Sequence, residues 1–232
     1  MPKRTVSSPA SASEMPGGAV MQFKFWLLGL SPMIWRRVHV PATFTLRQLH
    51  GVIQIAMGWG GFHLFQFRLR AIHYGSWELS ARSPDITLES LRLRKGARFA
   101  YDYDLIIPWR HEIRLEELLE PVAKRAYPFC VEGHEACPPE DCGGPSGFLA
   151  RRDAWLSDEG LDDLATVADF IDQVALKGRR DLLKDEALIE KLRDVSERLE
   201  LRHSWQGQPF SRKAVNARLK SGDHLALMHQ RF

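Results

Sequence analysis

The sequence predicts an α+β fold: a ββα unit, then further antiparallel strands that complete one mixed sheet packed on a helix, and finally a C-terminal helical insertion. Three observations support this prediction. Apolar residues alternate with period two through much of residues 21–115. One capped amphipathic helix interrupts that alternation, and helical periodicity replaces it beyond residue 150. Because the strands are grouped and do not alternate with helices, the order disfavours parallel βαβ winding.

The first elements form the ββα unit. Residues 21–28 alternate as a strand, and residues 35–40 have the character of a second strand. The helix that follows has clear boundaries. Thr45 and Gln48 form a T-x-x-Q capping box at its start, and Gly58 supplies its C-terminal stop.

The longest strand signal lies in residues 99–115. Apolar side chains occupy every odd position apart from His111, whereas most even positions are charged. Residues 63–72 also have strand character. Alternation of this length predicts half-buried strands joined as a hairpin that turns near Leu105–Pro108. His111 falls on the apolar face, where it is either a hydrogen-bonded interior histidine or a ligand or catalytic group.

Composition excludes several classes of protein. Apolar residues make up 44% of the 232 residues and charged residues 26%, which rules out a globally disordered, collagen-like or coiled-coil chain. No apolar run approaches the roughly 18 residues needed to cross a bilayer, so we expect no membrane partner. The net charge of +3 is smaller than a dedicated nucleic-acid-binding protein usually carries.

The chain divides into three expected regions. Residues 1–19 lack the apolar segment of a signal peptide and are predicted to form a disordered tail. Residues 20–150 are the predicted α+β core, and residues 151–232 a helical extension packed on it. With an odd number of cysteines and no signal peptide, a reducing cytoplasm is the expected location.

All three cysteines lie in a segment rich in proline and glycine. Cys130, His134, Cys137 and Cys142 together offer three thiols and one imidazole, which is a legitimate tetrahedral zinc set. The two alternatives are that the cysteines are reduced and structural, or that they have a redox role. His111 is another candidate for the fourth ligand, if the hairpin abuts this loop.

Carboxylates near these residues suggest a second kind of site. Asp104, His111 and either Glu140 or Asp141 would form a metal-assisted hydrolytic site if the fold brought them together. Adjacent residues in an extended chain point to opposite sides, so Glu140 and Asp141 cannot both serve that site directly. The alternative is that one of them holds the loop by accepting backbone N–H bonds.

Trp35, Arg36 and Arg37 are candidates for binding. They would present a stacking and phosphate-binding surface, with the two arginines facing opposite sides of a strand. The interpretation that we favour places Trp35 in the core and pairs one arginine with a carboxylate from a neighbouring strand. Trp109 and His111 of the hairpin are the other expected binding residues.

Several segments together resemble one family. Residues 30–38 (LSPMIWRRV) are similar to its L-x-P-x-I-W-R-R signature, and residues 138–144 (PPEDCGG) to its most diagnostic loop. The chain resembles the plasmid Ri ORF-three-like family, also known as insertion-sequence passenger TnpR-like proteins. The resemblance covers roughly residues 21–150. In residues 103–111 the family's Gly-Asp pair is replaced by Ile106-Ile107, while the aspartate before it and the final histidine remain.

The resemblance implies a small α+β domain of bacteria, archaea or their mobile elements, without an established enzymatic activity. We therefore expect a plasmid- or transposon-associated accessory protein that acts as a binding module for protein or nucleic acid. Two hypotheses remain beside it: a metal-dependent hydrolase or nuclease, and a module that binds structural zinc. Neither the ligand nor the oligomeric state follows from the sequence.

Overall fold

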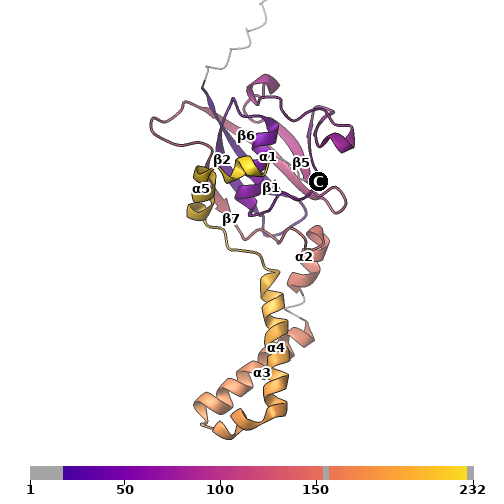
Figure 1. The fold of residues 1–232 in the computed structure, drawn as a ribbon, viewed down its shortest axis with the longest axis vertical. Coiled ribbons are helices and arrows are strands. Elements are labelled where there is room, and N and C mark those ends of the chain that lie inside the picture. Colours follow the sequence, from indigo (N-terminus) through magenta and orange to yellow (C-terminus); the bar gives the residue numbers. More distant parts are fainter. Residues whose placement is uncertain (1–17, 154–156, 229–232) are drawn as a thin grey trace, which may run out of the picture.

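The computed structural model describes residues 18–153 and 157–228, so residues 1–17 of the expected tail lie outside it. Its centre is a seven-stranded sheet in the order β4-β3-β5-β6-β1-β2-β7 (Figure 1). The strands are β1 (Val20–Leu27), β2 (Trp35–Pro41), β3 (Phe65–Leu69), β4 (Ile72–Gly75), β5 (Arg98–Tyr103), β6 (Trp109–Leu119) and β7 (Phe129–His134). The predicted α+β class is confirmed. Every pairing between these strands is antiparallel, where the sequence suggested a mixed sheet.

Helix α1 (Leu46–Met57) packs on one face of the sheet and closes the core. The predicted capping box is present, because the Thr45 side chain accepts from the Gln48 N–H and the Gln48 side chain accepts from the Thr45 N–H. Gly58 ends the helix in the left-handed conformation, at φ 88°. The alternation of β1 places Phe23 and Phe25, both fully buried, on the face beneath α1.

The sequence missed two strands. Residues 63–72 were expected to continue one strand, but Arg70 and Ala71 both adopt positive φ and turn the chain between β3 and β4. Strand β7 lies in the segment expected to be a loop. It pairs with β2, and a neighbouring helix also supports it: the Asn216 side chain accepts from the Cys130 N–H at 2.7 Å and donates to the Cys130 carbonyl at 2.8 Å. The Asn216 side chain thus satisfies backbone hydrogen-bonding groups on the outer edge of β7, which would otherwise be unpaired at the edge of the sheet.

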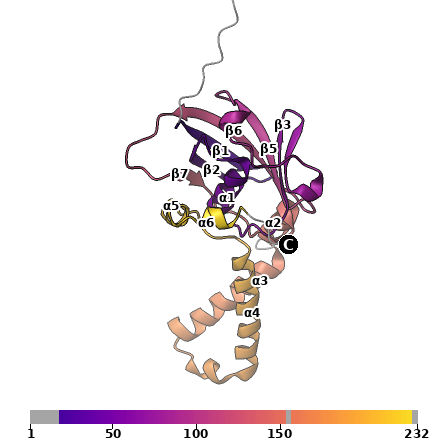
Figure 2. The same ribbon diagram turned by 45° about the horizontal axis from the view of Figure 1, so that its top comes forward.

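The remaining helices form two groups. Helices α5 (Arg212–Ser221) and α6 (Asp223–Ala226) pack against α1, on the same side of the sheet (Figures 1 and 2). Helix α2 (Gly144–Asp153) lies beside the core, and α3 (Asp158–Ile171) and α4 (Glu186–Ser204) pack on each other as an arm directed away from the sheet. The sequence placed the whole extension on the core, whereas here α5 and α6 pack on it and the arm projects.

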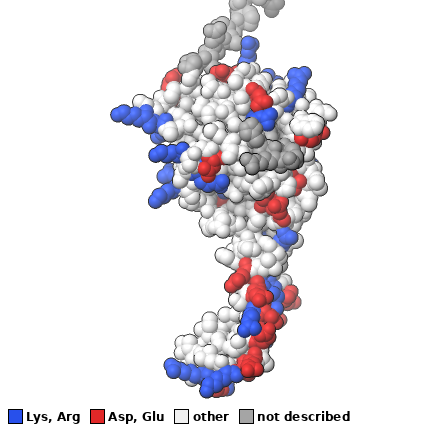
Figure 3. Space-filling view, viewed as in Figure 1, with Lys and Arg blue, Asp and Glu red and all other residues white. Residues whose placement is uncertain are grey.

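The arm formed by α3 and α4 carries many charged side chains. Basic and acidic side chains gather along it in the space-filling view (Figure 3), which is typical of solvated helix faces. Where the two helices meet, the buried Asp163 pairs with Arg198 at 2.6 Å and with Arg202 at 2.5 Å. Among the described residues, no helix is long and apolar enough to cross a membrane.

Asp163→Asn is expected to weaken the α3–α4 pairing by about 2 kcal/mol, because it removes the carboxylate that neutralises a buried arginine. Hydrogen bonds from Arg198 and Arg202 lower the pKa of Asp163 to about 2. This carboxylate therefore stabilises the arm above about pH 4, and the contribution is lost as the pH falls through the folded pKa. Hydrogen exchange of the α3 and α4 amides measures the effect. The exposed Asp162→Asn is the control, and equal protection in both variants would contradict the prediction.

Candidate functional site

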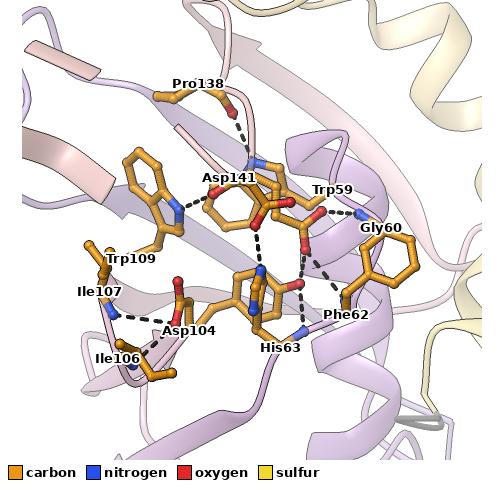
Figure 4. Close-up of polar contacts among 12 residues, drawn as sticks. Trp59, Gly60, Phe62, His63, Asp104, Ile106, Ile107, Trp109, Pro138 and Asp141 are labelled. Atoms are coloured by element: carbon orange, nitrogen blue, oxygen red, sulfur yellow. Dashed lines mark hydrogen bonds and ion pairs between the residues drawn. The ribbon is translucent and has the colours of Figure 1, made fainter. Parts of the chain in front are cut away.

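The loop of residues 138–142 is fastened to the core by two buried tryptophans (Figure 4). The Trp59 indole N–H donates to the Pro138 carbonyl, and the Trp109 indole N–H donates to the Glu140 carbonyl, both at 2.9 Å. Trp59 follows the end of α1, and Trp109 begins β6. The two rings lie 5.5 Å apart, so they form one aromatic platform beneath the loop.

Glu140 completes this attachment. Its carboxylate accepts from the Gly60 N–H at 2.7 Å, from the Phe62 N–H at 3.4 Å and from the Tyr103 hydroxyl. The Tyr103 hydroxyl in turn accepts from the His63 N–H at 3.2 Å. Burial, and then the bond to Glu140, raise the pKa of Tyr103, which keeps this phenol a donor. Glu140 therefore holds the loop through backbone N–H bonds, one of the two roles the sequence offered.

Asp141 points the other way, as expected for adjacent residues. Its carboxylate lies 2.7 Å from Nε2 of His63, in a pair that is largely open to solvent on the aspartate side (Figure 4). His63 was not among the site residues expected from the sequence. Its only local signal was the Gly60-Gly61 pair before it, which allows the chain to turn at the end of α1.

Among the described residues, those of the hypothetical hydrolytic site form no group that could hold a metal ion. Asp104 has φ 57°, and its carboxylate accepts from the backbone N–H groups of Ile106 and Ile107, which closes the hairpin turn. His111 is fully buried, with Nδ1 3.0 Å from the Trp109 carbonyl. Burial lowers the pKa of His111 to about 4, so the ring is neutral at pH 7. His111 is thus the hydrogen-bonded interior histidine of the two alternatives, and Trp109 beside it is also buried.

All three cysteines are buried and free. Cys130 is on β7 beside α5, Cys137 precedes the fastened loop, and the Cys142 carbonyl accepts from Arg151 of α2. His134 is exposed and pairs with the adjacent glutamate. Burial raises the pKa of Cys130 to about 11, and also raises those of the other two thiols. Within residues 18–153 and 157–228, no three His, Cys, Asp or Glu side chains are grouped to hold a metal ion, so the zinc set is not assembled here.

Arg36 lies on the core face of β2. It is 1% exposed, and its guanidinium donates to the carbonyls of Ala56, His134 and Glu135 and stacks on Phe210. Burial lowers the pKa of Arg36 from its ordinary value. The guanidinium thus links β2, α1 and the end of β7, and it is not accessible to a phosphate.

The predicted place of Trp35 in the core is wrong. Alternation along β2 puts Arg36 and Val38 beneath α1, so Trp35 and Arg37 share the opposite face. The pairing of one arginine with a carboxylate is confirmed, since Arg37 lies 2.6 Å from both Glu116 and Glu132, the second of them on the neighbouring β7. The expected binding residues are therefore split between the two faces of the sheet.

The face opposite α1, which we call the open face, carries an ordered row of cations. Cross-strand register places Arg98, Arg114, Lys24 and Arg37 side by side on β5, β6, β1 and β2. In the adjoining row, Trp26 and Trp35 are direct cross-strand partners. These side chains are half-buried or exposed.

The aromatic and cationic side chains of the open face touch. The Lys24 ammonium lies 4.2 Å from the centre of the Trp35 ring, and the Arg37 guanidinium lies 5.2 Å from it. Arg98 pairs with Glu112. In the part of the chain that the structure describes, Lys24 and Arg114 have no ion-pair partner. The open face thus combines two indoles with four cations, of which two are paired with glutamates.

Comparison with known proteins identifies the family. The model of the plasmid pRiA4b ORF-3-like protein family matches residues 19–173, well over half of the chain. The chain belongs to the plasmid pRiA4b ORF-3-like family. The family match continues past residue 150 through α3, beyond the resemblance seen in the sequence.

Two relatives accompany this family assignment. The uncharacterized protein y4hQ of Sinorhizobium fredii is 38% identical over 138 residues, which cover 56% of this chain and 70% of that protein. A crystal structure of MM3350, a protein of unknown function from Methanosarcina mazei Go1, superposes with a TM-score of 0.56 at 29% identity. That match covers 61% of this chain and 84% of MM3350. The names of these two relatives describe no activity.

Proposed function

We propose that this protein is a binding module that holds single-stranded nucleic acid on the open face of its sheet. The observation that carries the proposal is the row of Arg98, Arg114, Lys24 and Arg37 beside the Trp26–Trp35 pair. Unpaired bases stack on aromatic rings, and their phosphates bind lysine and arginine. Four adjacent strands span about 14 Å, which gives a short strand room to contact several cations.

The electrostatics of β2 support an anionic ligand. Burial lowers the pKa of His39, and the charges of Arg125 and Arg37 lower it further, which indicates positive potential at this end of the row. Glu112, Glu116 and Glu132 neutralise part of the face, so we expect moderate affinity and few phosphate contacts.

Binding fits the rest of the molecule better than catalysis. Glu140 is occupied by the loop and His111 is enclosed in the core, so neither is placed to act on a substrate. The sequence-based hypothesis of a protein partner is the competing binding role, but the free cations beside paired indoles favour nucleic acid. An origin in a plasmid or transposon, and a relation to TnpR-like proteins, stay predictions.

The test is fluorescence anisotropy with a labelled twelve-nucleotide oligo(dT), at 50 and 200 mM salt. We expect the double variant Lys24→Ala/Arg114→Ala to bind at least tenfold more weakly, because it removes both unpaired cations. If two phosphates are contacted, the logarithm of the binding constant should fall with that of salt concentration with a slope of about −1.4, and the variant should flatten it. Trp35→Leu should also weaken binding about tenfold, by loss of stacking.

The double variant Lys213→Ala/Lys220→Ala on the exposed surface of α5 is the matched control, because it removes two positive charges away from the open face. It should leave the affinity and the salt slope nearly unchanged. If it weakens binding as much as Lys24→Ala/Arg114→Ala does, the attraction comes from net charge and the proposed site is wrong. Absence of oligo(dT) binding at 50 mM salt would also reject the proposal and favour a protein partner.

A further inference from the structure

A cleft of about 440 Å³ lies at the junction of the core and the arm. One wall belongs to the turn between β1 and β2 and to α2, and the other to the end of α4 and the segment that follows it. Ligand sites for small molecules typically occupy 300–1,000 Å³ and often lie between structural units. This cleft is separate from the open face, so an inference about it stands independently of the proposed nucleic-acid binding.

The cleft is apolar over much of its lining. Leu30, Ile34, Phe148 and Trp205 contribute side chains from both walls. Ile34 and Phe148 are buried, and Leu30 and Trp205 are half-buried, so neighbouring residues hold these side chains in place. A planar or branched apolar group would find contacts on both sides of the cleft.

Arginines supply its polar side. The Arg151 guanidinium lies 4.6 Å from the centre of the Trp205 ring and donates through one nitrogen to the Cys142 carbonyl. Arg152 donates to the Ser31 carbonyl at 2.7 Å and pairs with the exposed Asp153, a contact of little energy. These contacts leave both side chains able to bind an anion, because a guanidinium has five N–H donors.

The third arginine is already neutralised. Arg202 is 8% exposed and pairs with Asp163 within the arm. Glu135, the acidic residue of the lining, pairs with the adjacent His134. In the described part of the chain Arg151 has no ion-pair partner. The cleft therefore has an excess of positive charge beside an aromatic wall.

We propose that this cleft binds a small organic carboxylate with an aromatic body. The carboxylate takes the unused donors of Arg151 in the bidentate geometry that arginine favours, with Arg152 beside it. The aromatic body packs against Trp205, Phe148 and Ile34. Because the ligand touches both walls, its binding also holds the arm against the core.

Isothermal titration with indole-3-propionate and its neutral amide tests this inference. The native protein should bind the carboxylate at least tenfold more tightly than the amide, and inorganic phosphate should bind far more weakly because it lacks the apolar body. Arg151→Gln keeps a donor for the Cys142 carbonyl but removes the charge, so it should reduce carboxylate affinity to that of the amide and leave amide affinity unchanged. Arg193→Ala, an exposed arginine elsewhere on α4, is the control and should bind like the native protein.

Three results would overturn the proposal. They are no carboxylate binding at millimolar concentration, equal binding of carboxylate and amide, and equal weakening of both ligands in Arg151→Gln. If Arg151→Gln fails to fold by circular dichroism, Trp205→Ala decides the question. It should weaken both ligands about equally, and unchanged binding would reject the cleft. Loss of oligonucleotide binding by open-face variants leaves these results unaffected, so the two proposals fail separately.

Discussion

Glu140→Ala is expected to lower the free energy of unfolding by about 3 kcal/mol, although Glu140 is only half-buried. The substitution removes a carboxylate that accepts from Gly60, Phe62 and Tyr103, and charge-assisted hydrogen bonds are about twice as strong as neutral ones. Two backbone N–H groups at the end of α1 lose their acceptor at once. Urea unfolding at pH 7, followed by circular dichroism, measures the loss.

Two variants control for this prediction. Asp141→Ala removes the neighbouring carboxylate, which makes one exposed pair with His63, and should cost under about 1 kcal/mol. Glu140→Gln keeps the shape and part of the accepting capacity, so its loss should lie between the two. Equal destabilisation by Glu140→Ala and Asp141→Ala would show that Glu140 does not fasten the loop. Binding of oligo(dT) should survive in every variant that stays folded.

Acid is expected to destabilise the protein strongly between pH 6.5 and about pH 4. Burial lowers the pKa of His111 to about 4 and that of His50 to about 3, whereas both titrate near 6.5 in the unfolded chain. His50 is enclosed against Phe65, with Nδ1 2.7 Å from the Tyr101 hydroxyl. In this window the unfolded chain binds more protons than the folded one, so stability falls as the pH falls.

Each buried histidine should contribute about 1.4 kcal/mol per pH unit across its window. Urea unfolding at half-unit steps from pH 7 to pH 4.5 measures the slope. His111→Phe should reduce that slope by about 1.4 kcal/mol per unit, whatever it does to stability at pH 7, because phenylalanine does not titrate. An unaltered slope in His111→Phe would mean that His111 is not kept neutral by the fold.

Local signals predicted much of the fold. The alternation of residues 99–115 located both strands of the β5–β6 hairpin, and the Thr45–Gln48 box located the start of α1. Strand β7 was missed because its backbone partners are distant in sequence: it pairs with β2, and Cys130 bonds to Asn216, a residue 86 positions away. A signal that comes from so distant a partner is absent from the segment itself.

For the candidate site too, some features were predictable from neighbouring residues and others depended on distant ones. Adjacency alone indicated that Glu140 and Asp141 would point apart, and the alternation of β6 placed His111 on the apolar face. It did not decide between an interior histidine and a ligand, because that depends on what surrounds the ring. The contact of His63 with Asp141 was not expected, since the two residues are 78 positions apart.

By itself, the sequence determined the α+β class, the caps of α1, the hairpin and the family resemblance, because each is encoded in neighbouring residues. Only the tertiary structure decided that Trp35 faces outward, that Arg36 is buried, and that four cations on four strands form one row. The physical reason is register. Which side chains become neighbours across a sheet depends on backbone pairing between distant segments, and a single chain pattern does not record that pairing.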